Sequence, residues 1–175
     1  MKVINFFGAP CAGKSTAASG LFNIMKRQGK KVEYVTEVAK DYIYSGSEHM
    51  LRDQLLLLAE QEHKVKRLLD KDIDYAITDA PILFSAFYGA QYYPESFQQL
   101  CLDLFNEYEN INIFVHRAHK FNSLGRIHNE EQSDQIDKQM YSYLINNNIS
   151  FVDISSNNAT AETLSTYIEY YNSNN

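Results

Sequence analysis

A glycine-rich segment near the N-terminus has the residue types and the spacing that suit phosphate binding. In "GAPCAGKST", Gly8 is followed, after four residues, by Gly13, Lys14 and Ser15. Glycines and small residues let backbone N–H groups turn inward around an anion. A lysine here can reach the β- and γ-phosphates of a nucleotide, and a serine hydroxyl can ligate Mg²⁺. The segment predicts a nucleotide-binding loop formed by Gly8, Ala9, Pro10, Cys11, Ala12, Gly13, Lys14, Ser15 and Thr16.

Asp79 ends the apolar segment "YAITD", which is typical of a buried strand. A carboxylate that follows a strand beside a phosphate loop can hold the coordination shell of Mg²⁺. With Ser15 it would form the protein part of a metal site. The alternative is a helix N-cap ahead of Pro81, where aspartate is favoured. The two roles are compatible.

Glu37 ends a second predicted strand, "KVEYVTE". A carboxylate at this place can accept the proton of a substrate hydroxyl, which makes Glu37 the candidate general base. The alternative is an acidic residue at a helix start, favoured by the helix dipole. Asp41 lies one helical turn later and is the second candidate for the base and for substrate contact.

The polar segment 117–130 contains Arg117, Lys120 and Arg126, with Gly125 as a candidate hinge. A cationic loop after a strand can close over the phosphates and stabilise the charge that develops during transfer. Arg117 and Arg126 are the candidate catalytic arginines. The alternative is a solvated surface loop.

Two further residues are candidates for substrate contact. Gln61 lies on a predicted long helix, and its amide could read a base through a paired donor and acceptor; the alternative is an exposed helical residue. Tyr88 belongs to a group of aromatic residues expected near the cleft. Most of these rings are expected in the core or at its rim, and one or two could stack on a planar substrate.

These side chains must be positioned by elements in which strands and helices alternate along the chain. The expected strands are 2–7, 31–37, 74–79, 111–116 and 150–154. The expected helices are 14–28, 38–45, 48–71, 82–92, 95–109, 132–147 and 160–171. Such alternation predicts an α/β fold with a parallel sheet covered on both faces, and ligands at the carboxyl ends of its strands. We expect one domain over 1–175.

Composition limits the class of function. Apolar residues make up 45% and charged residues 22% of the 175 residues, as in globular proteins. The net charge of −6 argues against a protein that tracks a long phosphate backbone. The two cysteines form no disulfide framework and the apolar runs are short, so we expect a cytoplasmic protein without a membrane span.

The chain resembles the small P-loop kinases of the nucleoside and nucleotide kinase-like group. The closest similarity is to the ribosylnicotinamide kinase-like ATPase/kinase family, which has viral members. The similar segments are "GAPCAGKST", "TEVAKDYI", "QLLLLAEQEHKVKRLL", "YAITDAPILFSAFY" and "GRIHNEEQSDQID". "TDAP" stands where deoxynucleoside kinases carry a "DRS"-type motif, and this leaves the acceptor open.

The resemblance implies a P-loop NTPase three-layer sandwich with a five-stranded sheet in 2-3-1-4-5 order. It also implies ATP with Mg²⁺ as phosphate donor and a LID-like segment at 117–130. It supports Glu37 as base and Arg117 and Arg126 as LID arginines. The predicted activity is phosphoryl transfer to a nucleoside- or nucleotide-like small molecule.

Two other functions compete with this prediction. One is a kinase that acts on a nucleic-acid hydroxyl, either a 5′ end or a hydroxymethylated base. The other is a nucleotide-dependent ATPase switch or motor, for which 175 residues leave little room. The oligomeric state is left open, with a homodimer as one alternative.

Overall fold

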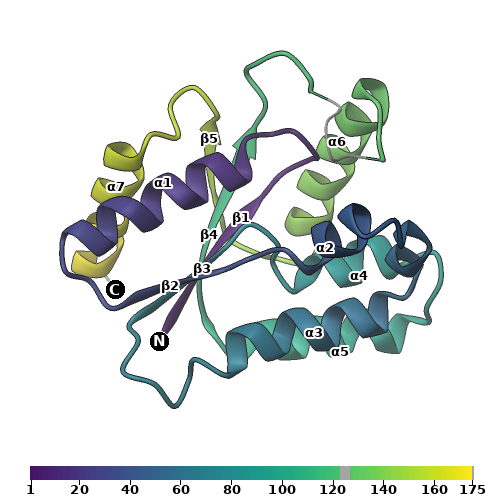
Figure 1. Cartoon of the computed structure of the whole chain (residues 1–175), viewed down its shortest axis with the longest axis horizontal. Coiled ribbons are helices and arrows are strands. Elements are labelled where there is room, and N and C mark those ends of the chain that lie inside the picture. Colours follow the sequence, from purple (N-terminus) through teal and green to yellow (C-terminus); the bar gives the residue numbers. More distant parts are fainter. Residues whose placement is uncertain (123–126, 175) are drawn as a thin grey trace.

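The structure, a computed structural model, describes residues 1–122 and 127–174, and within them five parallel strands form one sheet (Figure 1). The strands are β1 (Lys2–Phe7), β2 (Val32–Val35), β3 (Tyr75–Thr78), β4 (Glu109–His116) and β5 (Val152–Ser155). Their order is β2-β3-β1-β4-β5. The predicted α/β class and the 2-3-1-4-5 order are therefore confirmed.

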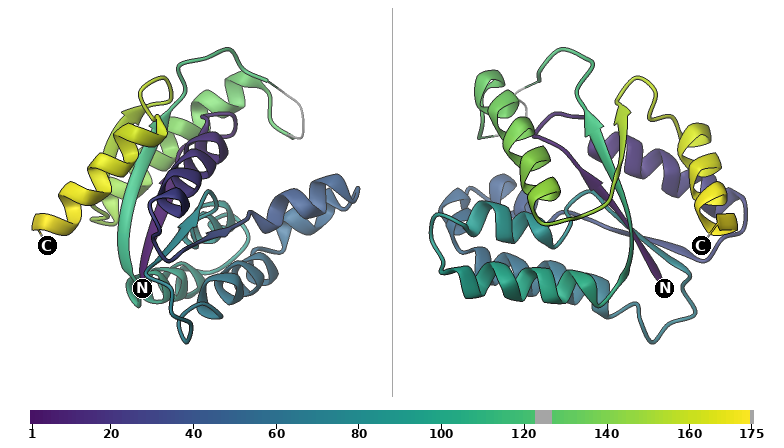
Figure 2. Two further views of the ribbon diagram at one scale, coloured as in Figure 1. Left: turned by 60° about the vertical axis from the view of Figure 1, so that its left-hand side comes forward. Right: turned by 180° about the vertical axis from the view of Figure 1, so that it is seen from behind.

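Helices cover both faces of this sheet and make three layers (Figures 1 and 2). The helices are α1 (Lys14–Arg27), α2 (Val38–Tyr44), η1 (Glu48–Arg52), α3 (Gln54–Lys66), α4 (Leu83–Gly89), α5 (Glu95–Asn106), α6 (Glu130–Asn146) and α7 (Ala161–Asn174). On one face, Leu21 of α1 and Leu164 of α7 pack in a cluster with Ile4 of the central strand. On the other face, α3, α4, α5 and α6 cover the sheet through two further apolar clusters.

The strands are mostly apolar because both of their faces are covered. In β1, the side chains of Ile4, Phe6 and Phe7 are fully buried. The buried polar side chain of this strand, Asn5, donates to the side-chain oxygens of Asn110 and Asn112 on neighbouring β4, at 2.9 and 3.0 Å. The buried amide group of Asn5 therefore has hydrogen-bond partners, as a buried polar group requires.

The prediction of one long helix over 48–71 was wrong. The structure has the short 3₁₀ helix η1, a break at Asp53, and then α3, which ends at Lys66. The Oδ1 atom of Asp53 accepts a hydrogen bond from the N–H of Leu56 at 3.1 Å, so Asp53 is the N-cap of α3. Ser47, which stands at the N-cap position of η1, makes no side-chain cap hydrogen bond.

The parallel direction of the strands brings the candidate functional residues to one edge of the sheet. The phosphate loop follows β1, Glu37 lies two residues after β2, and Asp79 comes directly after β3. Arg117 comes directly after β4. In the part of the chain that the structure describes, no helix combines the length and the apolar character needed to cross a membrane.

Candidate functional site

The loop between β1 and α1 has backbone angles that require glycine. Gly8 has a φ of 128° and Gly13 a φ of 97°, both in the region that side chains rarely adopt. A Cβ atom at Gly8 would also lie 2.4 Å from the carbonyl oxygen of Val115 on β4. Cys11 adopts a φ of 65°, which is unusual for a residue with a side chain. The loop is therefore pressed closely against the end of β4.

Lys14 opens α1 and its ammonium group lies inside the loop. Its Nζ donates hydrogen bonds to the carbonyl oxygens of Gly8 and Ala9, both at 2.8 Å. The same atom lies 5.5 Å from the ring centroid of Phe84 on α4. The charge of Lys14 thus faces the mouth of the loop, at the boundary with the pocket described below.

Asp79 is almost fully buried, with 3% of its surface exposed. Its Oδ1 atom has no hydrogen-bond partner among the residues that the structure describes. A buried carboxylate oxygen without a partner is costly unless a cation completes the site. With the hydroxyl of Ser15, Asp79 offers the oxygen ligands that Mg²⁺ prefers. The residues present therefore fit the predicted metal.

The negative charge of Asp79 affects the neighbouring Tyr34. Burial raises the pKa of the Tyr34 hydroxyl, and the negative charges of Asp79 and then Glu37 raise it further.

Within residues 1–122 and 127–174, no three His, Cys, Asp or Glu side chains gather as metal ligands.

Glu37 stands at the N-cap position of α2, but its side chain makes no cap hydrogen bond. The carboxylate instead lines the pocket, and its Oε2 atom lies 3.3 Å from Nζ of Lys40. Asp41, the second candidate base, has 79% of its side chain exposed and lies 3.9 Å from Lys64. Asp41 is not part of the described pocket wall. The geometry therefore favours Glu37 for contact with a substrate.

A pocket of about 740 Å³ opens beside the phosphate loop. Its wall runs from Lys14 and Ser15 past Glu37 to the aromatic side chains of Phe84 and Tyr88 on α4. Burial raises the pKa of Tyr88, and the negative charge of Glu37 raises it further, so this hydroxyl stays protonated at neutral pH. The volume is within the range of small-molecule sites.

Gln61 also lines this pocket, but its amide is used inside the protein. Its Oε1 accepts the N–H of Val38 at 3.1 Å, and its Nε2 lies 3.4 Å from Oγ1 of Thr78. The residue is buried. In this arrangement Gln61 ties the first turn of α2 to the end of β3, and thereby positions Glu37.

Arg117 points to α6 rather than to the phosphate loop. Its Nη1 lies 3.3 Å from Oε1 of Glu130, and its Nη2 is paired with the carboxylate of Asp134. Its guanidinium also lies 5.3 Å from the ring centroid of Phe121. Arg117 is not part of the described pocket wall. Arg126 and Gly125 lie outside the described residues.

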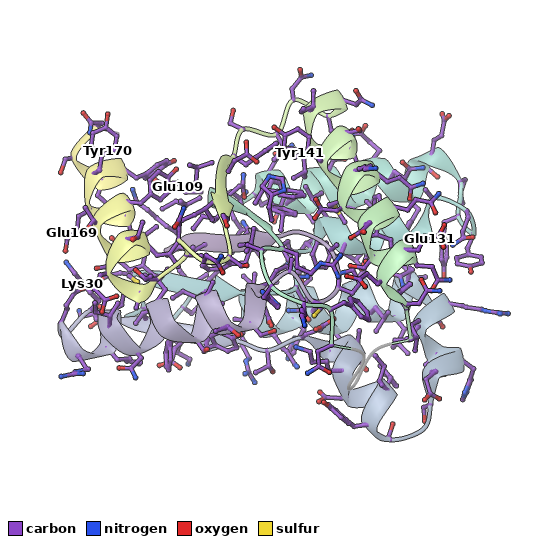
Figure 3. All side chains as sticks on the ribbon, turned by 90° about the horizontal axis from the view of Figure 1, so that it is seen from above. Lys30, Glu109, Glu131, Tyr141, Glu169 and Tyr170 are labelled. Atoms are coloured by element: carbon purple, nitrogen blue, oxygen red, sulfur yellow. The ribbon has the colours of Figure 1, made fainter. Side chains whose placement is uncertain are left out.

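Side chains from the N-terminal half of α6 contact the backbone of the phosphate loop. The hydroxyl of Ser133 donates to the carbonyl oxygen of Pro10 at 2.6 Å, and Oδ1 of Asp137 lies 3.4 Å from the N–H of Ala9. The thiol of Cys11 accepts the N–H of Asn122 at 3.2 Å. Figure 3 shows α6 in the view from above, with Glu131 labelled in its first turn. Elements distant in sequence thus hold the loop in shape.

The sequence reasoning missed Lys40. Its Nζ donates to the hydroxyl of Ser15 at 2.9 Å and lies 3.6 Å from Oδ2 of Asp79. It also pairs with Glu37, so one ammonium group joins three candidate residues. Lys40 stands three residues after Glu37, which places both on one face of a helix, and this spacing could have identified it.

Comparisons with known proteins agree with this architecture. A family model described as an AAA domain matches residues 3–161. Among solved structures, deoxyadenosine kinase from M. mycoides with bound dATP superimposes with a TM-score of 0.56. The sequences are 16% identical, over 97% of this chain and 98% of that one. This likeness concerns the fold. No curated protein matches the sequence significantly.

Proposed function

The chain belongs to the AAA domain family, and on this premise we propose that it is an ATP-dependent phosphotransferase. It would move the γ-phosphate to a hydroxyl or phosphate group of a nucleoside- or nucleotide-like small molecule. The observation that carries this proposal is one continuous pocket, which contains both the phosphate loop and a wall suited to a second ligand. A protein that only hydrolyses ATP needs no such wall.

The donor would be held by the loop and by Lys14. Inward backbone N–H groups and the N-terminus of α1 favour the anionic phosphates. Lys14 would exchange its bonds to Gly8 and Ala9 for bonds to the β- and γ-phosphates. Mg²⁺, held by Ser15 and Asp79, would supply positive charge against the phosphate oxygens.

The acceptor would lie between Glu37 and the aromatic wall of α4. Its hydroxyl oxygen attacks the γ-phosphorus, the bond to the β-phosphate oxygen breaks, and the proton passes to the carboxylate of Glu37. Phe84 and Tyr88 offer ring surfaces against which a planar group can pack. The fold similarity to a deoxyadenosine kinase and the resemblance to ribosylnicotinamide kinase-like proteins both support an acceptor of this class.

The predicted roles of the arginines depend on movement. Arg117 would have to leave Glu130 and Asp134 to reach the phosphates. We propose that Arg117 then stabilises the charge on the transferring phosphate. The same role for Arg126 remains a prediction from the sequence. The nucleic-acid alternative receives less support, because the net charge is −6 and the pocket wall is largely apolar.

The test is a panel of acceptors incubated with γ-labelled ATP and Mg²⁺. It includes nucleosides, nucleoside monophosphates, ribosylnicotinamide, and oligonucleotides with a 5′ hydroxyl or a hydroxymethylated base. We expect label to move to a nucleoside- or nucleotide-like small molecule. Transfer to oligonucleotides alone would favour the nucleic-acid alternative. ATP hydrolysis that no acceptor changes would favour the ATPase switch and contradict the proposal.

A further inference from the structure

Lys40 lies where the three oxygen-bearing side chains of the candidate transfer site meet. Its Nζ is 2.9 Å from Oγ of Ser15, 3.3 Å from Oε2 of Glu37 and 3.6 Å from Oδ2 of Asp79. Ser15 and Asp79 are the residues that fit Mg²⁺, and Glu37 is the proposed base. One positive charge therefore stands among the groups that would otherwise receive a metal ion and a proton.

One positive charge stands against two negative charges at this point, so one negative charge is left over without a metal. Two carboxylates, Glu37 and Asp79, face the one ammonium group of Lys40. Asp79 is buried, so its charge needs a cation close by. An ammonium group is a compact point charge with three donors, which matches the three oxygens around it.

We propose that Lys40 is the built-in counter-ion of the metal site. It keeps Ser15, Glu37 and Asp79 together when no metal is bound, and it has to withdraw for Mg²⁺ to bind. This inference rests on the proposed function, because it assumes that Ser15 and Asp79 hold the metal. It goes further in making Lys40 the residue that sets how tightly the metal binds.

Two positive ions cannot share these oxygens without strong repulsion. The preferred distance between Mg²⁺ and its oxygen ligands is about 2.0–2.1 Å. A metal at Ser15 and Asp79 would therefore lie very close to the present position of the ammonium group. Lys40 can move away, because its flexible four-carbon side chain begins on the first turn of α2 and is partly exposed.

The withdrawal of Lys40 would also free the carboxylate of Glu37 from its ion pair. While the ion pair exists, Oε2 of Glu37 is engaged with the ammonium group at 3.3 Å. Once Lys40 has left, that oxygen is available to accept the proton of an acceptor hydroxyl. Lys40 is thus a positioning residue that couples completion of the metal site to release of the base.

A purely structural ion pair predicts a different behaviour. In that case, neutralising Lys40 would destabilise the fold and weaken or leave unchanged the affinity for metal. If Lys40 is instead the counter-ion of the metal site, neutralising it removes a positive charge that competes with the metal. The affinity for metal should then rise. The sign of the change in metal affinity separates the two roles.

The experiment is a titration of Mn²⁺ followed by electron paramagnetic resonance, on the full chain alone and with ADP. We expect Lys40→Gln to bind Mn²⁺ at least about tenfold more tightly than the wild type, in one or both conditions. Lys40→Arg keeps the charge and should bind as the wild type does. Lys26→Gln is the matched control, because Lys26 pairs with Glu33 on the surface.

A second variant locates the metal. Lys40→Gln/Asp79→Asn should lose the gain in affinity, because the buried carboxylate is then absent. Equal or weaker Mn²⁺ binding by Lys40→Gln, or a gain that survives Asp79→Asn, would overturn the inference. Circular dichroism checks the fold of each variant.

A measurement on the wild type makes the test independent of the variants. We expect Mg²⁺ with ADP to raise the labelling of Lys40 by acetic anhydride severalfold relative to Lys26, read by mass spectrometry. Unchanged labelling would contradict the withdrawal of Lys40.

The acceptor panel reports on the proposed function separately: transfer without these metal effects refutes the role of Lys40 alone. Metal effects without transfer to any acceptor refute the phosphotransferase alone.

Discussion

At the scale of single residues, Lys14 has the clearest assignment, since both the motif and the structure place its ammonium group in the phosphate loop. Its hydrogen-bond acceptors include the backbone carbonyls of Gly8 and Ala9, and phosphate oxygens can take the place of these acceptors. The guanidinium of Arg117 is paired with α6 in this structure and would first have to move, whereas Lys14 already stands in the loop. Lys14 should therefore carry much of the charge stabilisation of the transferring group.

We predict that Lys14→Ala abolishes phosphoryl transfer. Loss of a positioned cation at the β- and γ-phosphates commonly costs several kcal/mol of transition-state stabilisation, which is about a thousandfold or more in rate. The measurement is transfer of label from γ-labelled ATP by the purified variant. Near-normal turnover would refute the assignment of the loop.

Glu37 permits a test that separates a base from a metal ligand. Glu37→Gln keeps the size and the hydrogen-bonding capacity of the side chain but removes the proton acceptor. We predict that kcat falls by about 10²-fold or more while ATP affinity is largely kept. The measurement is steady-state kinetics together with ATP binding by calorimetry.

Asp41→Asn is the matched control for this prediction. Asp41 lies one turn from Glu37 on the same helix, but its side chain is exposed. We expect its kinetics to stay close to those of the wild type. If Asp41→Asn lost activity and Glu37→Gln did not, Asp41 would be the base.

At the scale of the elements, the break between η1 and α3 depends on Asp53. Its Oδ1 accepts the N–H of Leu56 at 3.1 Å and also lies 3.2 Å from the hydroxyl of Tyr93. The cap starts α3 at the position from which Gln61, two turns later, reaches Val38 at the start of α2. The cap thus contributes indirectly to the geometry of Glu37.

We predict that Asp53→Ala lowers the free energy of unfolding by about 1 kcal/mol, the usual cost of a lost N-cap. Asp53→Asn keeps an acceptor oxygen and should cost much less. Tyr93→Phe removes the hydroxyl, which contacts Asp53 and accepts the N–H of Leu55, and it measures the contribution of these two bonds. Urea unfolding followed by circular dichroism measures all three. Equal stability of Asp53→Ala and the wild type would show that packing alone defines the start of α3.

At the scale of the whole molecule, buried groups that resist ionisation make the fold sensitive to alkaline pH. Cys101 is fully buried, and burial raises the pKa of its thiol to about 12. Burial likewise raises the pKa of Tyr143 to about 12. The unfolded chain ionises such groups near their ordinary values, so above those values it binds fewer protons than the folded chain does.

Stability must therefore fall as pH rises from about 9 toward 12. Each such group contributes a slope of up to about 1.4 kcal/mol per pH unit. We predict a progressive decrease in the free energy of unfolding above about pH 9, measured by urea unfolding at a series of pH values. Cys101→Ala should lower stability at every pH through its cavity, but it should flatten the slope near pH 9 to 10. A slope identical to that of the wild type would contradict the role of Cys101.

The sequence by itself determined the features that neighbouring residues create. The phosphate loop is one contiguous motif, and its glycines stand at two positions whose positive φ favours glycine. The alternation of strands and helices predicted the parallel sheet, and hence the common edge that carries Glu37 and Asp79. The break at Asp53 escaped the prediction because the apolar spacing continues through it, whereas a cap depends on one side-chain hydrogen bond.

Only the tertiary structure decided which side chains meet across the site. Lys40 contacts Ser15 and Asp79, which lie 25 and 39 residues away in the chain. Gln61 is turned to Val38, and Arg117 to α6, although their types also suited substrate contacts. The physical reason is that ion pairs and hydrogen bonds act over a few ångströms. The packing of whole elements sets those distances, and local spacing in the sequence does not encode them.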